Sequence, residues 1–158
     1  MDFTKFKKAK VFQRGRGGRD AAHLADEKLY HELLERHTEI ERTTTELENG
    51  IETITRIPSK DEKLIKILQE HAMGMKKRFD SNRAIRSWDP LFIELFDHRE
   101  QIQMNSTMLD DGIKVTLTAD DEKICELIKR HDETLHAFVN YGFKAARHES
   151  PYRPDEDN

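Results

Sequence analysis

The chain has 158 residues, 35% of them hydrophobic and 37% charged, with a net charge of −4 at pH 7. This length suits one domain with a continuous core. No run approaches the roughly 18 apolar residues that a membrane span needs. A single cysteine, Cys125, excludes an intrachain disulfide, a CxxC redox pair and covalent CxxCH attachment of haem.

The first segment, residues 1–19, is strongly basic. It holds seven Lys or Arg against one Asp, with Phe3, Phe6 and Phe12 among them. We interpret it as a flexible arm, and its mixture of basic and aromatic residues raises the alternative that it binds nucleic acid or an anionic surface. Because it has no apolar signal-peptide core, we expect a cytoplasmic location, with a longer exported precursor as the alternative.

The rest of the chain contains an internal repeat. Residues 28–34 align with 90–96 at an offset of 62, and DEKLIKILQEH (61–71) aligns with DEKICELIKRH (121–131) at an offset of 60. We interpret this as a tandem duplication, with repeat 1 at 28–80, a linker at 81–89 and repeat 2 at 90–142. A unit of this size rarely folds alone, so we expect both units to share one core within a single domain, 20–147.

The hydrophobic period changes twice inside each unit, from helical to alternating and back. Asn49-Gly50 and Asp111-Gly112 are typical of hairpin turns that need φ > 0. Residues at every second position then share a strand face, Met104, Ser106 and Met108 on one strand and Ile113, Val115 and Leu117 on the next. Each unit is therefore predicted to be helix, hairpin, helix.

Helix starts are marked by polar residues. Ser59 with Glu62, and Thr118 with Asp121, resemble capping boxes before the last helix of each unit, and Asp89-Pro90 is typical of an N-cap followed by proline. We predict an α+β fold in which the two hairpins form a four-stranded antiparallel sheet, covered by four helices, with a pseudo-twofold axis. Residues 148–158 show no apolar period and are interpreted as a flexible tail.

Three stretches, ENGIETIT, IRSWDPLFIELF and DGIKVTLTADDEK, resemble an uncharacterised family of small bacterial proteins built on the same duplicated unit. The similarity covers about residues 29–147. The resemblance implies the repeat and the fold. It implies no activity, cofactor or partner.

His71 and His131 close the repeated phrase and fall on the apolar stripes of matching helices. A pseudo-twofold axis brings equivalent residues together, so these imidazoles are predicted to ligate haem b or a transition metal in a pocket between the repeats. Met75, one turn after His71, is a candidate soft ligand. His31 is a candidate third nitrogen for a metal.

The alternative prediction is an interaction or assembly module without a cofactor, including self-association, in which His71 and His131 are structural. His98 and His136 have charged neighbours and are interpreted as surface residues. No nucleophile motif or phosphate-binding loop is present, so we predict a non-enzymatic ligand-binding protein.

Overall fold

The computed structural model describes residues 21–81, 83, 86 and 88–150 and shows an α+β architecture. The described residues lie in two successive series of elements. The first series is α2 (Ala21–Glu35), the 3-10 turn η1 (His37–Glu39), β1 (Glu41–Leu47), β2 (Gly50–Arg56) and α3 (Glu62–Ser81). The second series is α4 (Pro90–Asp97), η2 (Arg99–Gln101), β3 (Gln103–Leu109), β4 (Gly112–Thr118) and α5 (Glu122–Tyr141). The predicted order of helix, hairpin and helix is confirmed in both.

A short helix that the sequence did not indicate, α6 (Phe143–Ala146), follows α5. The described part of the chain therefore has five α-helices, where four were predicted. No helix among the described residues is long and apolar enough to cross a bilayer. The predicted basic arm, residues 1–19, and most of the predicted tail, 151–158, lie outside the described residues.

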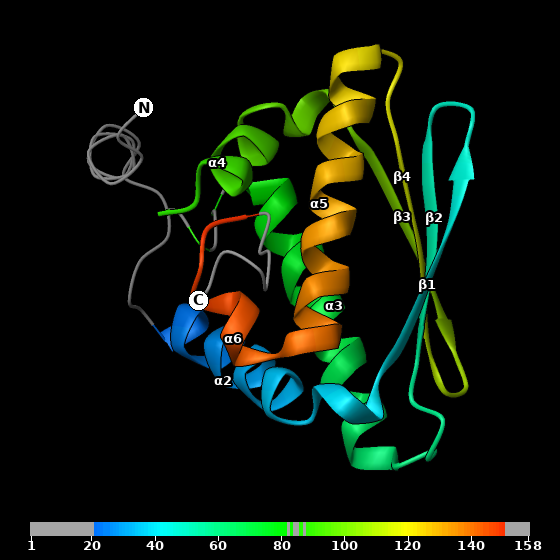
Figure 1. Cartoon of the computed structure of the whole chain (residues 1–158), viewed down its shortest axis with the longest axis vertical. Coiled ribbons are helices and arrows are strands. Elements are labelled where there is room, and N and C mark those ends of the chain that lie inside the picture. Colours follow the sequence, from blue (N-terminus) through cyan, green and yellow to red (C-terminus); the bar gives the residue numbers. More distant parts are fainter. Residues whose placement is uncertain (1–20, 82, 84–85, 87, 151–158) are drawn as a thin grey trace.

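The four strands form one antiparallel sheet in the order β1-β2-β4-β3, so the two hairpins meet at β2 and β4. The described helices lie on one side of this sheet (Figure 1). The register places Met104 opposite Leu117, Ser106 opposite Val115 and Met108 beside Ile113, which confirms the predicted strand faces. In α3 and α5 the buried apolar residues recur at helical spacing and pack in the core. They are Leu64, Ile65, Leu68 and Phe79 in α3 and Ile124, Leu127 and Ile128 in α5.

Two hydrophobic clusters fill the space between sheet and helices, and each takes a residue from the other hairpin. Ile51 of β2 packs in the cluster that α4 and α5 dominate, and Ile113 of β4 packs in the cluster that α2 and α3 dominate. Both isoleucines are almost fully buried. Complete burial of such a side chain stabilises by about 1.5–3 kcal/mol. Each half therefore depends on the other to complete its core.

The predicted positive φ is found at Gly50 (+158°) but not at Gly112. The register pairs Leu47 with Gly50, so the two-residue turn is Glu48-Asn49, and no non-glycine residue of either turn has positive φ. A Cβ on Gly50 would collide with the carbonyl oxygen of Leu117, and one on Gly112 with that of Thr55. Close approach of β2 and β4 is what requires glycine at both places.

The helix caps also differ from the predicted capping boxes. Asp61 Oδ1 accepts a hydrogen bond from the Leu64 N–H (3.0 Å), and Asp121 Oδ1 accepts one from the Lys123 N–H (2.7 Å). The capping boxes at Ser59 and Thr118 were therefore wrong, because an aspartate closer to each helix meets the first free N–H groups. The predicted cap of α4 is confirmed, since Asp89 accepts from the Leu91 N–H and Pro90 is the first helical residue.

Candidate functional site

The two predicted ligand histidines take matching places on α3 and α5, and each packs against an aromatic ring. The His71 ring lies 6.5 Å from the Tyr30 ring of α2, and the His131 ring lies 5.3 Å from the Phe92 ring of α4. Tyr30 precedes Phe92 by the same 62 residues that relate the first helices of the two series. The same kind of histidine–aromatic pair therefore occurs in both halves.

Each of these histidines has a buried nitrogen without a protein partner. Nδ1 of His71 and Nδ1 of His131 are both buried with no hydrogen bond, although each residue as a whole is partly accessible. Desolvation lowers the pKa of both imidazoles to about 4. For His131 the nearby Arg42 charge acts in the same direction, whereas Asp26 acts weakly against the shift of His71. Both rings are therefore neutral nitrogen donors at pH 7.

Arg86 joins the two histidine–aromatic pairs. Its guanidinium carbon lies 5.1 Å from the centre of the Phe92 ring and 4.3 Å from that of Trp88. Its positive charge also acts to lower the pKa of Tyr30 and of His131, although burial is the largest influence on both. We call Tyr30, His71, Arg86, Phe92 and His131 the Arg86 cluster.

The backbone and side chain of Arg86 are both unusual. Its φ is +54°, in the left-handed region that non-glycine residues rarely adopt. Its Nε is buried without a hydrogen bond, although the terminal nitrogens are paired. Backbone strain of this kind costs about 1–3 kcal/mol and persists where surrounding contacts enforce it.

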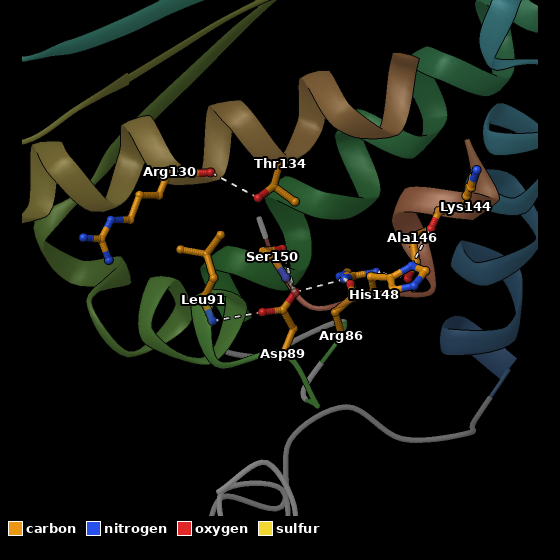
Figure 2. Close-up of polar contacts among 9 residues, drawn as sticks. All are labelled: Arg86, Asp89, Leu91, Arg130, Thr134, Lys144, Ala146, His148 and Ser150. Atoms are coloured by element: carbon orange, nitrogen blue, oxygen red, sulfur yellow. Dashed lines mark hydrogen bonds and ion pairs between the residues drawn. The ribbon is translucent and has the colours of Figure 1, made fainter. Parts of the chain in front are cut away.

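Those enforcing contacts come from Asp89 and the end of the described chain (Figure 2). Arg86 Nη1 donates to the Ala146 carbonyl (2.7 Å), and Nη2 donates to Asp89 Oδ2 and to the His148 carbonyl, both at 2.9 Å. Asp89 is fully buried and its Oδ2 also accepts from the Ser150 hydroxyl at 2.7 Å. Residues 148–150, the start of the predicted tail, are thus held against the linker between α3 and α4.

The other two predicted ligands, His31 and Met75, do not complete a metal-binding set among the described residues. His31 is exposed on α2, with its ring against Tyr30 and Phe143. Met75 is partly buried on α3, one turn beyond His71. Among the described residues no group of three or more His, Cys, Asp or Glu is placed to hold a metal ion.

Two surface hollows are lined by residues outside the Arg86 cluster. One, of about 440 Å³, is bordered by α3 and by Ser106 of β3. The other, of about 340 Å³, lies along α2 and includes His31, whose ring lies 4.6 Å from that of Tyr30. Neither of the two is lined by His71 or His131.

A polar network that the sequence analysis missed connects β1 to α5. Arg42 Nη1 donates to Asp132 Oδ1 (2.5 Å), and the Thr44 hydroxyl donates to the same oxygen (2.8 Å). The Thr44 Oγ1 also lies 2.8 Å from His136 Nε2. His136 was predicted to be a surface residue, and this was wrong, because the ring is half-buried by the strand that faces it.

This network is not a catalytic relay. In a hydroxyl–histidine–carboxylate relay the carboxylate holds the ring nitrogen that does not face the nucleophile. Here Asp132 Oδ1 lies 3.8 Å from Nε2 of His136, the nitrogen that also faces Thr44. The arrangement closes the gap between strand and helix.

The remaining histidines have structural or solvent-exposed places. Nδ1 of His37 donates to the Val139 carbonyl (2.6 Å), which ties η1 to α5. His98 is exposed and bonds to Gln101, as predicted for a surface residue. Cys125 is partly buried beside the core, with its thiol 3.3 Å from the Ala119 carbonyl.

One signal for the Arg86 cluster was present in the sequence. Tyr30 and Phe92 are aligned aromatic residues at the 62-residue offset that relates residues 28–34 to 90–96. Arg86 had no such signal, because its place depends on contacts with residues about 60 positions away.

Comparison of the chain with family models, with curated proteins and with solved structures found no match in any of the three.

Proposed function

We propose that this chain is a non-enzymatic ligand-binding protein in which His71 and His131 ligate the metal centre of a haem or a transition metal ion. The observation that carries the proposal is the pair of buried Nδ1 atoms without partners in matching positions. Leaving such an atom unsatisfied costs about 1–3 kcal/mol. A ligand that supplies the missing partner recovers that free energy.

Imidazole is suited to this role when it is neutral. Because the pKa of each ring is lowered to about 4, protons do not compete with a metal for these nitrogens at pH 7. Imidazole nitrogens bind iron, copper, nickel and zinc. The same burial that withholds a hydrogen-bond partner therefore prepares both rings as donors.

Two protein donors favour a ligand that brings donor atoms of its own. The imidazoles of His71 and His131 would hold the iron of a haem, and the porphyrin would supply its remaining nitrogen donors. Near His131 the charges of Arg86 and Arg42 are balanced by those of their partners Asp89 and Asp132. The rings of Tyr30 and Phe92 add apolar contact surface.

The proposal includes an origin by tandem duplication, with the two units related by a pseudo-twofold axis. Equivalent hydrogen bonds support it. The Ile57 N–H donates to the Asp111 carbonyl (2.8 Å), and 62 residues along, the Ala119 N–H donates to the Asn49 carbonyl (2.9 Å). Such an axis relates His71 to His131 and accounts for two like donors.

The test is titration of the purified full-length chain in two arms, one with haem and one with Cu²⁺, Ni²⁺ or Zn²⁺. We expect a Soret shift that saturates at about one haem per chain, or else a stoichiometric metal ion by elemental analysis. His71→Gln and His131→Gln should each lose the signal, with folding followed by circular dichroism. His98→Gln is the matched control, because His98 is exposed and bonded only to a neighbouring side chain.

The two arms separate the possible ligands. Binding of haem alone identifies a porphyrin site, and binding of an ion alone identifies a simple metal site. If neither arm binds, the proposal is overturned and the histidines serve packing, as the alternative prediction of a cofactor-free module holds.

A further inference from the structure

β3 is an edge strand that lacks the usual protection against pairing with another chain. Its sequence, QMNSTML, contains no charge and no proline over Gln103–Leu109. Within the residues that the structure describes, β3 pairs with β4 alone. Half of the backbone N–H and C=O groups of an edge strand point away from its neighbour, and proteins protect such edges with charges, proline or bulges.

The opposite edge strand is different. β1 reads ERTTTEL and carries three charged residues. Two of its side chains are already engaged within the chain, since Arg42 and Thr44 both bond to Asp132 of α5. This edge is therefore protected by charge and by its own helix.

A surface of mixed character, with exposed methionines, lies next to the unprotected edge. The hollow of about 440 Å³ between α3 and β3 is lined by Met73, which is 52% exposed, and by the polar or charged residues Lys76, Lys77, Asp80, Ser81 and Ser106. Met108, on the same face of β3 as Ser106, is 42% exposed. Exposed methionines beside an unpaired edge are typical of an interface that another chain covers.

We propose that a second copy of this chain pairs its β3 antiparallel with this β3, centred on Ser106, to join the two four-stranded sheets into one. This register places Met104 opposite Met108 on the helix side and Asn105 opposite Thr107 on the other side. Ser106 lies opposite its own copy. Met104 meets Met108 and the polar Asn105 meets the polar Thr107, whereas the end pair, Gln103 and Leu109, joins a polar residue to an apolar one. No like charges of the two strands are brought together.

A second copy fits this edge better than a strand of another kind. In an antiparallel pair, side chains of opposed residues lie on the same side of the sheet. Self-pairing centred on Ser106 satisfies this, because opposed residues differ in number by an even amount and therefore come from the same face of β3. The methionines of each copy then cover the hollow beside the other. The interface is closed and isologous, so it ends at a dimer.

The test uses the full-length chain in sedimentation equilibrium over a wide range of concentration. We expect a concentration-dependent dimer. Ser106→Asp and Ser106→Lys should each weaken it at least about tenfold, because like charges then lie directly opposite each other. A mixture of the two variants should restore a heterodimer, since the opposed charges are now of opposite sign.

Thr45→Lys is the matched control, because Thr45 is an exposed residue of the other edge strand. It should leave the dimer unchanged. A wild-type chain that stays monomeric at all concentrations, or two Ser106 variants that dimerise as well as wild type, would overturn the proposal. The outcome is independent of the histidine site, and His71→Gln should dimerise like wild type.

Discussion

The two edges of the sheet differ in their side-chain contacts, although the helices and strands on both sides follow the same order along the chain. At the β1 edge, Arg42 and Thr44 bond to Asp132 of α5, which we call the polar seam. At the β3 edge, the residues 62 positions after Arg42 and Thr44 are Met104 and Ser106, and the residue 60 positions before Asp132 is Ala72 of α3. We call Met104, Ser106 and Ala72 the open seam.

The difference teaches that backbone arrangement alone does not close a seam. Ala72 has no carboxylate to hold a strand side chain, and Lys76, in the place of His136, pairs with Asp80 along its own helix at 3.1 Å. Gln69 of α3 donates to the carbonyls of Leu109 and Gly112 at the turn end of the hairpin (2.9 and 3.0 Å), but Ser106, at the middle of β3, lines a hollow. The helix side chains at these positions therefore decide whether the middle of an edge strand is bonded to its helix.

The largest expected effect comes from breaking the polar seam. Asp132→Ala leaves Arg42, whose side chain is only 6% exposed, without its carboxylate. Removing one partner of a buried pair costs about 3–5 kcal/mol. Urea denaturation should show this loss, whereas Glu133→Ala, an exposed neighbour on the same helix, should change the free energy of unfolding by less than about 0.5 kcal/mol.

Acidification should lower the free energy of unfolding through His71 and His131 by similar amounts, whereas the two seams differ from each other. The pKa of His71 and of His131 is about 4 in the folded protein, against 6.5 as the ordinary value. The unfolded chain therefore takes up protons first, and stability is lost as the pH falls from about 6.5 to about 4. The difference between 6.5 and about 4 limits the contribution of each ring to about 3.4 kcal/mol.

Urea midpoints measured across this pH range check the prediction. His71→Gln and His131→Gln should each flatten the pH dependence by a similar amount. A curve that stays level between pH 6.5 and 4 in the wild-type chain would show that the rings are not held neutral.

A third prediction compares matched hydroxyls in the two seams. Thr44→Val removes the donor to Asp132 and should cost about 1–2 kcal/mol, because a buried oxygen loses a partner. Ser106→Val, at the equivalent exposed place, should cost less than about 0.5 kcal/mol in the monomer. Equal losses in thermal or urea unfolding would contradict the distinction between the seams.

The last prediction concerns assembly and copies the polar seam into the open one. The double variant Ala72→Asp with Met104→Arg adds an ion pair worth at most about 1 kcal/mol, which offsets part of the apolar contact that both side chains make with the core. Because the new pair would cross the hollow, self-association should weaken. A dimer unchanged by this graft would mean that the open seam takes no part in it.

Local patterns predicted the secondary structure well. Alternating residues in β3 and β4 identified the strand faces, and Asp89-Pro90 located the start of α4. The prediction of the N-caps of α3 and α5 failed, because two nearby polar residues compete to cap each helix. Asp61 and Asp121 replaced the expected Ser59 and Thr118 caps because a carboxylate one residue from the helix reaches the free N–H groups more directly.

The candidate site could be predicted only in part. The inward-facing stripe of α3 and α5 placed His71 and His131 on faces that pack against other helices, and both rings do pack against aromatic residues. Arg86 and the segment that holds it could not be inferred, since the guanidinium reaches carbonyls 60 and 62 residues away. His136 was misplaced because its sequence neighbours are charged while its spatial neighbour is Thr44.

The sequence by itself determined the order of helices and hairpins, the faces of the strands and the inward direction of the two repeated histidines, because these depend on periods of a few residues. The tertiary structure alone decided which seam is sealed, where Arg86 lies and which buried nitrogens lack partners. Those outcomes depend on groups far apart in the chain, whose distances are set only when the two halves exchange Ile51 and Ile113 to complete each other's core.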